Sequence, residues 1–402
     1  MLFILEKAFL RCYMQLFKLL SYLVPYRWPQ TFTGSGATKQ LLTHIAKQKH
    51  RHILLVTDQG LLDLGLLEPI YEHAQALKLQ VSTYAGILPD PTVKQIEAGL
   101  QQLQNTEADA VLAVGGGSVI DGAKLIAARA LNNKPVMKMT GLFHVEKGML
   151  PLYVVPTTAG TGSEVTIAAV VTDTEAQEKL AVIDHRIMPT AAALDGDIMK
   201  GLPPAITAAT GMDALTHAVE AYLSHISSAS TDKQALAAAK LVFDNLEKAV
   251  KEGANLNVRQ NMAKASHLAG MAFTKAGVGY IHAIAHNLGA LYHLPHGLAN
   301  AIVMPYVLRF SLPNAKERLA QLARHCGLSQ SQDAETAAQA LIDKIIAMNH
   351  AFEFPAHPPQ LEERHLEQIA TNARAEARFT YAVPRYMTQA EAVALLKEIK
   401  GA

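Results

Sequence analysis

The chain has little cysteine and almost no net charge. Its 402 residues include two cysteines, Cys12 and Cys326, and 36 basic residues stand against 35 acidic ones. Two cysteines so far apart form no disulfide framework, which fits a reducing compartment, and we expect a cytoplasmic protein. A net charge of +1 gives no reason to expect nucleic acid or an acidic partner.

Charged and aromatic residues are also few, at 18% and 6% of the chain, whereas half of the residues are hydrophobic. Internal repeats and low-complexity segments are lacking, so the composition is that of a globular protein without disordered character. A chain of this length can bury two sizeable cores, and we expect two domains.

The N-terminus is apolar but lacks an uncharged run long enough to cross a bilayer. Lys7, Arg11, Gln15 and Lys18 recur every three or four positions and draw one polar stripe along a helix. These charges interrupt the apolar region and no small-residue cleavage site follows, which argues against a secretory signal. Two interpretations stay open: a helix packed on the protein's own surface or on a second subunit, or a membrane-surface contact through residues 1–24.

Short apolar runs alternate with helical patterns between about residues 30 and 200. This alternation predicts a parallel sheet covered by helices on both faces. Two further strand-like runs, 168–171 and 180–183, lack a long helix between them and predict a hairpin or a sheet edge. The expected strands are 52–58, 81–84, 110–114 and 152–155, and the expected helices lie near 61–77, 92–105 and 119–132.

Beyond Pro203 and Pro204 the chain is helical almost throughout. Helix breaks are expected at Pro295, Pro305 and Pro313. We therefore expect an apolar helical extension (1–28), an α/β domain (29–204) and an α-helical domain (205–402). The expected helices of the last domain are 205–223, 230–252, 258–275, 281–292, 313–326, 334–348 and 388–399.

A glycine-rich stretch, Gly-Gly-Gly-Ser-Val-Ile-Asp-Gly-Ala-Lys at 115–124, follows a predicted strand and opens a helix. Glycines there let the backbone approach a phosphate, whose charge the free N–H groups and the helix dipole favour. Ser118 is expected as the N-cap, with Asp121 completing a capping box. A capped turn without a ligand is the alternative, and the spacing is not that of the Rossmann signature.

A second small, hydroxyl-rich loop, Pro-Thr-Thr-Ala-Gly-Thr-Gly-Ser-Glu at 156–164, follows another predicted strand and suits phosphate or ribose. Asp58 ends the first predicted strand of the sheet. A carboxylate there accepts hydrogen bonds from the ribose of NAD and repels the extra phosphate of NADP, although an Asp that merely opens a turn is an equal alternative.

Candidate ligands for a metal site of one carboxylate and three imidazoles lie in two clusters of the helical region. Asp213 and His217 are four residues apart and share one helix face, as do His282 and His286, while His296 follows a proline. One carboxylate with imidazoles makes a mixed nitrogen and oxygen site that suits a divalent transition metal.

With these motifs in order, the chain resembles the iron-containing (group III) alcohol dehydrogenases. The resemblance spans roughly residues 30–400. It implies a dehydroquinate synthase-like architecture, with a dinucleotide-binding α/β domain followed by an all-α metal-binding domain. It implies a metal site of Asp213, His217, His282 and His296, with His286 as a nearby catalytic histidine. The residues expected to bind NAD are Asp58, Gly116, Gly117, Ser118, Asp121, Thr157, Thr158, Thr161, Thr166 and Lys179. One departure is Asp90, where family members often have Asn.

The resemblance implies reversible hydride transfer between a small alcohol or aldehyde and NAD, by a homodimer. The metal, Fe(II) or else Zn, polarises the substrate oxygen, and His286 relays the proton. Glu220 is a candidate partner for the second nitrogen of a ligand imidazole. A glycerol or polyol dehydrogenase and a hydroxyacid–oxoacid transhydrogenase are alternatives. A dehydroquinate-synthase-like lyase is disfavoured because residues 282–305 contain no Lys or Arg to hold a phosphate.

Overall fold

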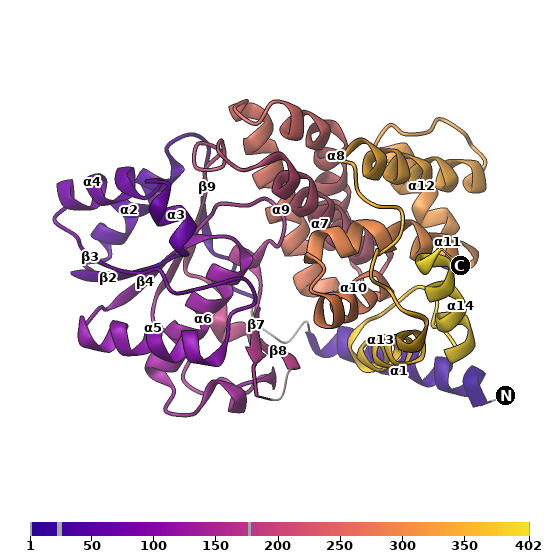
Figure 1. Ribbon diagram of the computed structural model, residues 1–402, viewed down its shortest axis with the longest axis horizontal. Helices are drawn as coiled ribbons and strands as arrows, with labels where there is room; N and C mark the ends of the chain where they lie inside the picture. Colours follow the sequence, from indigo (N-terminus) through magenta and orange to yellow (C-terminus); the bar gives the residue numbers. More distant parts are fainter. Residues whose placement is uncertain (1, 22–25, 176–177, 402) are drawn as a thin grey trace. The chain divides into compact units, whose positions relative to one another are not determined.

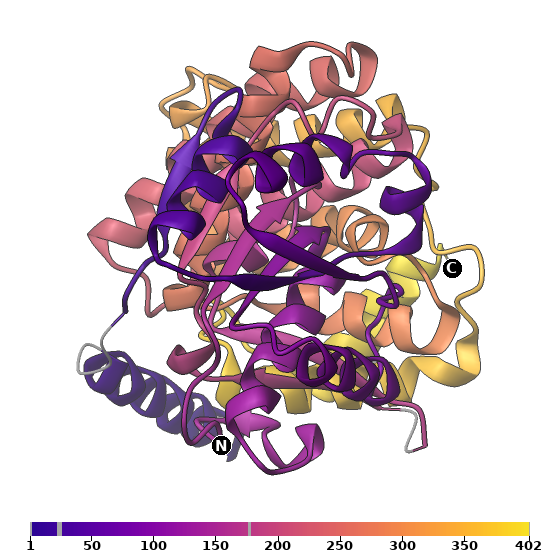
Figure 2. The same ribbon diagram turned by 90° about the vertical axis from the view of Figure 1, so that its left-hand side faces the viewer.

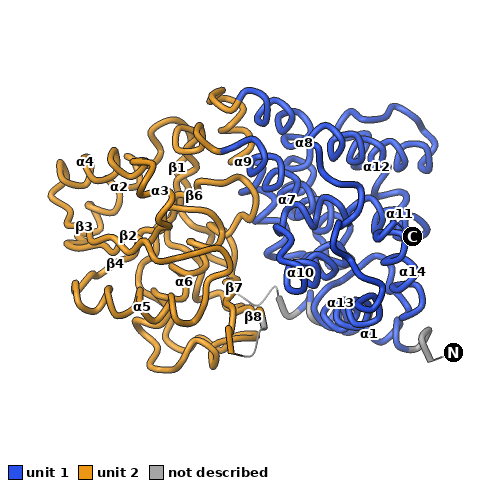
Figure 3. The backbone as a smooth tube through the Cα atoms, in the orientation of Figure 1, with its two compact units in different colours: residues 1–24, 203–252, 264–402 blue, residues 25–202, 253–263 orange. Residues whose placement is uncertain are grey.

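The structure is a computed structural model that describes residues 2–21, 26–175 and 178–401. The chain divides into two compact units (Figure 3). Unit 1 comprises residues 1–24, 203–252 and 264–402, and unit 2 comprises residues 25–202 and 253–263.

Unit 2 is built on a six-stranded parallel sheet with the strand order β1-β9-β6-β4-β2-β3. Every residue of β4 and β6 is buried, as expected for strands that are covered on both faces. The strands are β1 (Gln30–Thr33), β2 (His52–Val56), β3 (Gln80–Tyr84), β4 (Ala110–Gly115), β6 (Leu152–Pro156) and β9 (Ala191–Leu194).

Helices cover both faces of this sheet, above and below the strands in Figures 1 and 2. Because side chains alternate along a strand, Ile53 and Leu55 join the core with α2 and α4, and Leu54 and Val56 the core with α5 and α6. The predicted α/β fold is confirmed. The helices are α2 (Ala37–Lys47), α3 (Gln59–Asp63), α4 (Glu68–Ala76), α5 (Val93–Asn105) and α6 (Gly117–Leu131).

A smaller sheet contains the two further strand-like runs. β7 (Ala168–Asp173) pairs antiparallel with β8 (Glu178–Ile183), as predicted, and β5 (Gly141–Leu142) lies parallel to β8. The sequence pattern does not predict β1 or β9, because both are four residues long and β9 is Ala-Ala-Ala-Leu, which carries no β-branched residue. Single turns of 3₁₀ helix lie at 136–138, 163–165 and 185–187.

Unit 1 is helical in the part of the chain that the structure describes, which confirms the predicted helical domain. Its central helix is α7 (Pro204–Leu223), in which every residue from Gly211 to Leu223 is buried. A helix buried all round belongs to the core of its domain. The others are α8 (Ala229–Lys251), α10 (Tyr280–Tyr292), α11 (His296–His325), α12 (Ala334–Ala351), α13 (Leu366–Thr380) and α14 (Gln389–Lys400), with a 3₁₀ turn at 363–365 and with α9 (Leu256–Ala276) entering from unit 2.

Two predicted helix breaks are wrong. α11 continues through Pro305 and Pro313, and Pro295 alone marks its start. Each internal proline removes one helical hydrogen bond. The extensive packing of α11 along α12 and α7 offsets that loss.

The N-terminal helix, α1 (Leu2–Ser21), packs on its own unit. Leu10 and Met14 are buried, and Met14 lies in a cluster with residues of the α7–α8 loop and of the segment after α13. Glu6 pairs with Arg378 of α13 at 2.9 Å. The opposite face exposes Phe9, Leu16 and Leu19. Among the described residues, none of the helices is both long and apolar enough to cross a membrane.

A fully buried amine links α6 to the segment that leads into β7. Lys124 donates hydrogen bonds to the Thr166 carbonyl, the Thr166 hydroxyl and the Ala168 carbonyl at 2.7–2.9 Å. Burial lowers the pKa of Lys124 to about 8 from an ordinary 10.5, although Asp121 and Glu164 partly oppose this shift.

Lys124→Met should therefore change how stability depends on pH. Below pH 8 the amine is charged in both the folded and the unfolded chain. Between about 8 and 10.5 the unfolded chain binds more protons, so Lys124 makes the wild type more stable as pH rises, by roughly 3 kcal/mol at most. We expect the Tm of the wild type minus that of the variant to increase as the pH rises from about 7.5 to 10. Parallel curves would contradict the lowered pKa.

Candidate metal centre and cofactor loops

One face of α7 carries two acidic residues and one histidine of the site. Asp213, His217 and Glu220 are four and three residues apart, so they point the same way from a buried helix. Their burial removes them from water, and each must therefore find a polar partner within unit 1.

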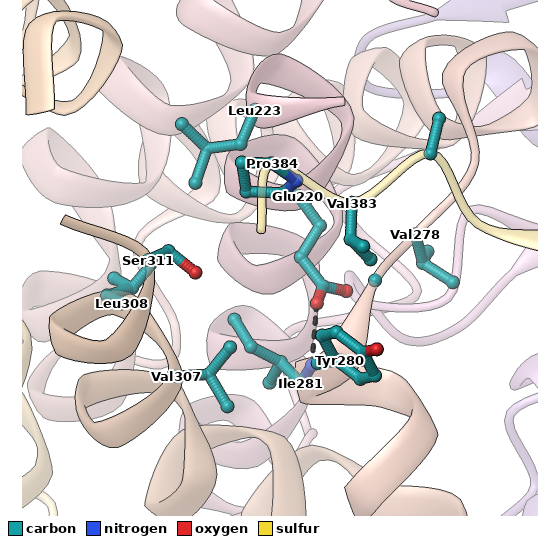
Figure 4. A pocket seen from close by; sticks show the side chains of 12 residues that line it. Glu220, Leu223, Val278, Tyr280, Ile281, Val307, Leu308, Ser311, Val383 and Pro384 are labelled. Atoms are coloured by element: carbon teal, nitrogen blue, oxygen red, sulfur yellow. Dashed lines mark hydrogen bonds between the residues drawn. The ribbon is translucent and has the colours of Figure 1, made fainter. Parts of the chain in front are cut away.

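Glu220 connects α7 to the start of α10. Its two carboxylate oxygens accept hydrogen bonds from the Ile281 N–H at 2.7 Å and the His282 Nδ1–H at 2.6 Å. The negative charge lies at the positive end of the helix dipole of α10. Figure 4 shows the contact with Ile281 beside a cavity of about 20 Å³, which is lined mostly by apolar side chains and has room for a single water. Gly279 permits this approach, because a Cβ there would lie 2.9 Å from Glu220 Oε1.

His296 enters the site at the first turn of α11. A Cβ on the next residue, Gly297, would lie 2.2 Å from the Ala209 carbonyl oxygen of α7, so only glycine lets the two helices come this close. The approach places His296 Nε2 at 3.4 Å from Asp213 Oδ1.

The four predicted metal ligands come together. Donor atoms of Asp213, His217 and His282 all lie within 4.8 Å of one another, and His282 Nε2 is 3.7 Å from Asp213 Oδ1. The rings of His217 and His282 stack with their centroids 4.6 Å apart. With His296 beside Asp213, the set offers three imidazoles and one carboxylate.

The charges of these residues suit a cation. Burial raises the pKa of Asp213, but the surrounding histidines, His217 first, outweigh it and hold the pKa well below its usual range. Burial lowers the pKa of His282, but Glu220 and Asp213 outweigh it and raise the pKa to about 9. Since the Nδ1–H of His282 donates to Glu220, Nε2 is the nitrogen that faces Asp213 and that would bind a metal, once deprotonated. The donor set thus fits a divalent transition metal.

Asn300 is a site residue that sequence reasoning missed. It is fully buried, and its Nδ2 donates to Asp213 Oδ1 at 2.8 Å. The same atom lies 3.3 Å from His282 Nε2 and 3.2 Å from His296 Nε2. Its position four residues after His296 on α11 is the one signal in the sequence that could have pointed to it.

His286, the predicted catalytic histidine, has a different environment from the ligands. Its ring stacks against that of His296 at 5.4 Å, while Nδ1 lies 2.7 Å from Glu376 Oε1 of α13. Glu376 is a second residue that sequence reasoning missed. His293 stands outside this group, as the left-handed C-cap of α10.

In unit 2 the two predicted loops lie against each other. They leave β4 and β6, which are neighbours in the sheet, at their carboxyl ends. The Thr157 N–H donates to the Gly115 carbonyl at 3.0 Å. A Cβ on Gly116 would contact Thr158 at 3.5 Å, and one on Gly117 would clash with Thr161 at 2.5 Å. The carboxyl ends of such strands are where open α/β sheets bind ligands.

The predicted capping box is wrong. α6 begins at Gly117, with Gly116 as a cap that has no side-chain bond, so Ser118 is already inside the helix. Asp121 instead accepts the Val170 N–H at 3.0 Å and ties α6 to β7. Gly116 has an extended backbone at the cap position, so α6 begins two residues before the predicted start.

The other predicted cofactor residues border these loops or support them. Asp58 follows β2 and caps α3 by accepting the Leu61 N–H at 3.0 Å. Lys179 forms an ion pair with Asp90 at 2.7 Å, and the Asp90 N–H approaches Ser118 Oγ at 3.4 Å. Asp90 has a φ of 59°, a conformation that Asn and Asp adopt more readily than most residues. Thr166 lies buried and bonded to Lys124.

Comparison with known proteins agrees with this geometry. Residues 29–196 match the iron-containing alcohol dehydrogenase family, and residues 207–400 match the C-terminal part of the same family. Alcohol dehydrogenase 4 of Saccharomyces cerevisiae is 37% identical over 92% of this chain and 96% of its own length. The NAD-dependent methanol dehydrogenase of Bacillus methanolicus is 36% identical over 92% and 97%.

A solved structure of 1,3-propanediol oxidoreductase superposes with a TM-score of 0.90 at 35% identity, covering 93% of this chain and 99% of that one. The predicted family is therefore confirmed: the chain belongs to the iron-containing alcohol dehydrogenases.

Proposed function

We propose that this protein interconverts a small, uncharged alcohol and its aldehyde, with NAD as the hydride carrier and a divalent metal ion at Asp213, His217, His282 and His296. The class of activity, an NAD-dependent alcohol dehydrogenase, follows from the family and its named relatives. The convergence of one ionised carboxylate and three imidazoles in unit 1 is the observation that carries the proposal.

A divalent ion at this site supplies a Lewis acid for the alcohol or carbonyl oxygen. Fe(II) is our first assignment because the family is iron-containing. Zn is the second, because an N/O site binds Zn²⁺ more tightly than Fe²⁺. Glu220 orients His282 through Nδ1, and Asn300 lies within hydrogen-bond distance of both Asp213 and His296.

We assign His286 the transfer of the alcohol proton. Its Nδ1 is engaged by Glu376, which leaves Nε2 to take the proton in alcohol oxidation and to return it in aldehyde reduction.

For NAD we assign the carboxyl ends of the parallel strands in unit 2. The assigned contacts are Asp58, Gly116, Gly117, Ser118, Asp121, Thr157, Thr158, Thr161, Thr166 and Lys179. The abutting glycine and threonine loops support this assignment. Asp58 supports NAD over NADP, because a carboxylate at the end of β2 repels a 2′-phosphate.

The substrate is proposed from the relatives' names, which include methanol, lactaldehyde and 1,3-propanediol. All are short and uncharged. A diol is the second candidate, supported by the 1,3-propanediol dehydrogenases among the relatives.

We propose residues 1–28, 29–204 and 205–402 as the limits of the N-terminal extension, the α/β domain and the helical domain.

His282→Ala should abolish both metal binding and catalysis. We would load wild type and variant anaerobically with Fe(II) or Zn²⁺ and measure bound metal together with oxidation of short primary alcohols and diols, using NAD and NADP. We expect stoichiometric metal and NAD-dependent activity in the wild type, and at least a hundredfold loss in the variant.

His293→Asn is the matched control, since this histidine lies outside the metal cluster and Asn tolerates its left-handed conformation. It should keep both metal and activity. An active His282→Ala, or a wild type that is active without metal, would contradict the proposed centre.

We propose further that the protein is a cytoplasmic homodimer whose α1 touches membrane surfaces. Phe9, Leu16 and Leu19 are each more than half exposed on one face of α1. Arg11 is exposed as well and favours anionic lipid. Both cysteines are free, which fits a reducing compartment.

Replacing Leu16 and Leu19 together by Gln tests the role of α1. We expect the wild type to sediment with vesicles of anionic lipid, the double variant to do so severalfold less, and both to have the mass of a dimer by analytical ultracentrifugation. Leu64→Gln, at an exposed leucine of unit 2, is the control and should sediment like the wild type. A wild type that stays in solution at low salt argues against the membrane contact.

A further inference from the structure

A second carboxylate–histidine pair lies one helical turn beyond the first. His286 follows His282 by four residues on α10, and its Nδ1 lies 2.7 Å from Glu376 Oε1. The hydroxyl of Tyr381, just after α13, donates to the same carboxylate oxygen at 2.6 Å. The chain of contacts from Tyr381 through Glu376 to His286 lies within unit 1.

The charges along this chain fix which atom carries each proton. Burial raises the pKa of Glu376, but the hydrogen bonds from His286 and Tyr381 outweigh it, so the carboxyl is ionised at neutral pH. Burial and the charge of Glu376 raise the pKa of Tyr381 well above 10, so its hydroxyl stays a donor. An ionised carboxylate can only accept hydrogen bonds, and the proton of neutral His286 must therefore sit on Nδ1.

The orientation of the His286 ring is also defined by its surroundings. Its plane is 14° from that of His296 and 66° from that of His282, with centroids at 5.4 and 5.9 Å. The side chain is 44% exposed, so packing alone does not hold it. The hydrogen bond between its Nδ1 and Glu376 Oε1 fixes the rotation of the ring.

We propose that Glu376 and Tyr381 are positioning residues for His286: they hold its Nδ1–H tautomer and keep Nε2 as the proton-accepting nitrogen beside the metal ligands. This inference deepens the proposed function and rests on the role assigned there to His286. Glu220 does the same for His282, so two carboxylates orient two imidazoles of one helix, one to coordinate a metal and the other to move a proton.

The direct test reads the tautomer and does not depend on activity. Nitrogen-15 NMR of histidine-labelled, Zn²⁺-loaded protein distinguishes protonated from bare ring nitrogens, and the His286 signals are those missing from His286→Ala. We expect protonated Nδ1 and bare Nε2 in the wild type, and loss of this single tautomer in Glu376→Ala. Tyr381→Phe, which removes one hydroxyl, should weaken the preference less. A wild type with the proton on Nε2, or a tautomer unchanged in Glu376→Ala, overturns the proposal.

Kinetics then show whether the positioning matters for the reaction. Glu376→Ala should lower kcat about ten- to a hundredfold, with bound metal and the KM for NAD unchanged. The kcat of Glu376→Gln should lie between those of the wild type and Glu376→Ala, because its amide oxygen still accepts a hydrogen bond from Nδ1. Glu367→Ala removes a carboxylate of the same helix that bonds Gln389, and should have no effect.

A double-mutant cycle separates this inference from the function it rests on. If Glu376 acts through His286, Glu376→Ala causes no further loss of kcat in a His286→Ala background. Equal losses in both backgrounds overturn the positioning role. A fully active His286→Ala with the expected tautomer in the wild type instead overturns the assigned proton transfer and leaves the geometry standing.

Discussion

A carboxylate buried among imidazoles is the interaction on which the helical unit depends. Asp213 lies in the fully buried part of α7, where an unpaired charge would cost several kcal/mol. It is stabilised by Asn300 and by the histidines that surround it. His217 lies on α7 itself, but His282 comes from α10, and His296 and Asn300 come from α11, so three helices must meet at one point. Glycines at 279 and 297 allow the meeting, because a side chain at either would collide with Glu220 or Ala209.

The same physical device recurs at two neighbouring histidines. Glu220 binds Nδ1 of His282 and Glu376 binds Nδ1 of His286, so the Nε2 atoms of both rings are left for chemistry. What differs is the surroundings. His282 is almost fully buried beside Asp213, whereas nearly half of the His286 side chain is open to solvent. A ring nitrogen beside the Asp213 anion, as in His282 and His296, suits a metal ligand, and access to solvent suits a residue that exchanges protons.

Much of the fold and of the metal site could be predicted from local sequence, and the features that could not be predicted depend on tertiary packing. Four-residue spacings reveal Asp213 with His217 and His282 with His286, and apolar runs reveal β2 and β4, since these signals lie within single elements. Glu376 is ninety residues from His286, and only the packing of α13 on α10 brings them together. Ser118 is expected as the helix cap, yet α6 already begins at Gly117. Pro305 reads as a break, yet tertiary packing keeps α11 intact.

The most direct test of the metal centre is anomalous diffraction from crystals loaded with Fe(II) or Zn²⁺, with data collected on either side of the metal's absorption edge. The account predicts one strong anomalous peak, within about 2.0–2.3 Å of a carboxylate oxygen of Asp213 and of a ring nitrogen of each of His217, His282 and His296. His286 should lie outside the coordination sphere. A peak elsewhere in a fully active crystal form, or a peak that His286 coordinates in place of one of the four, would contradict it.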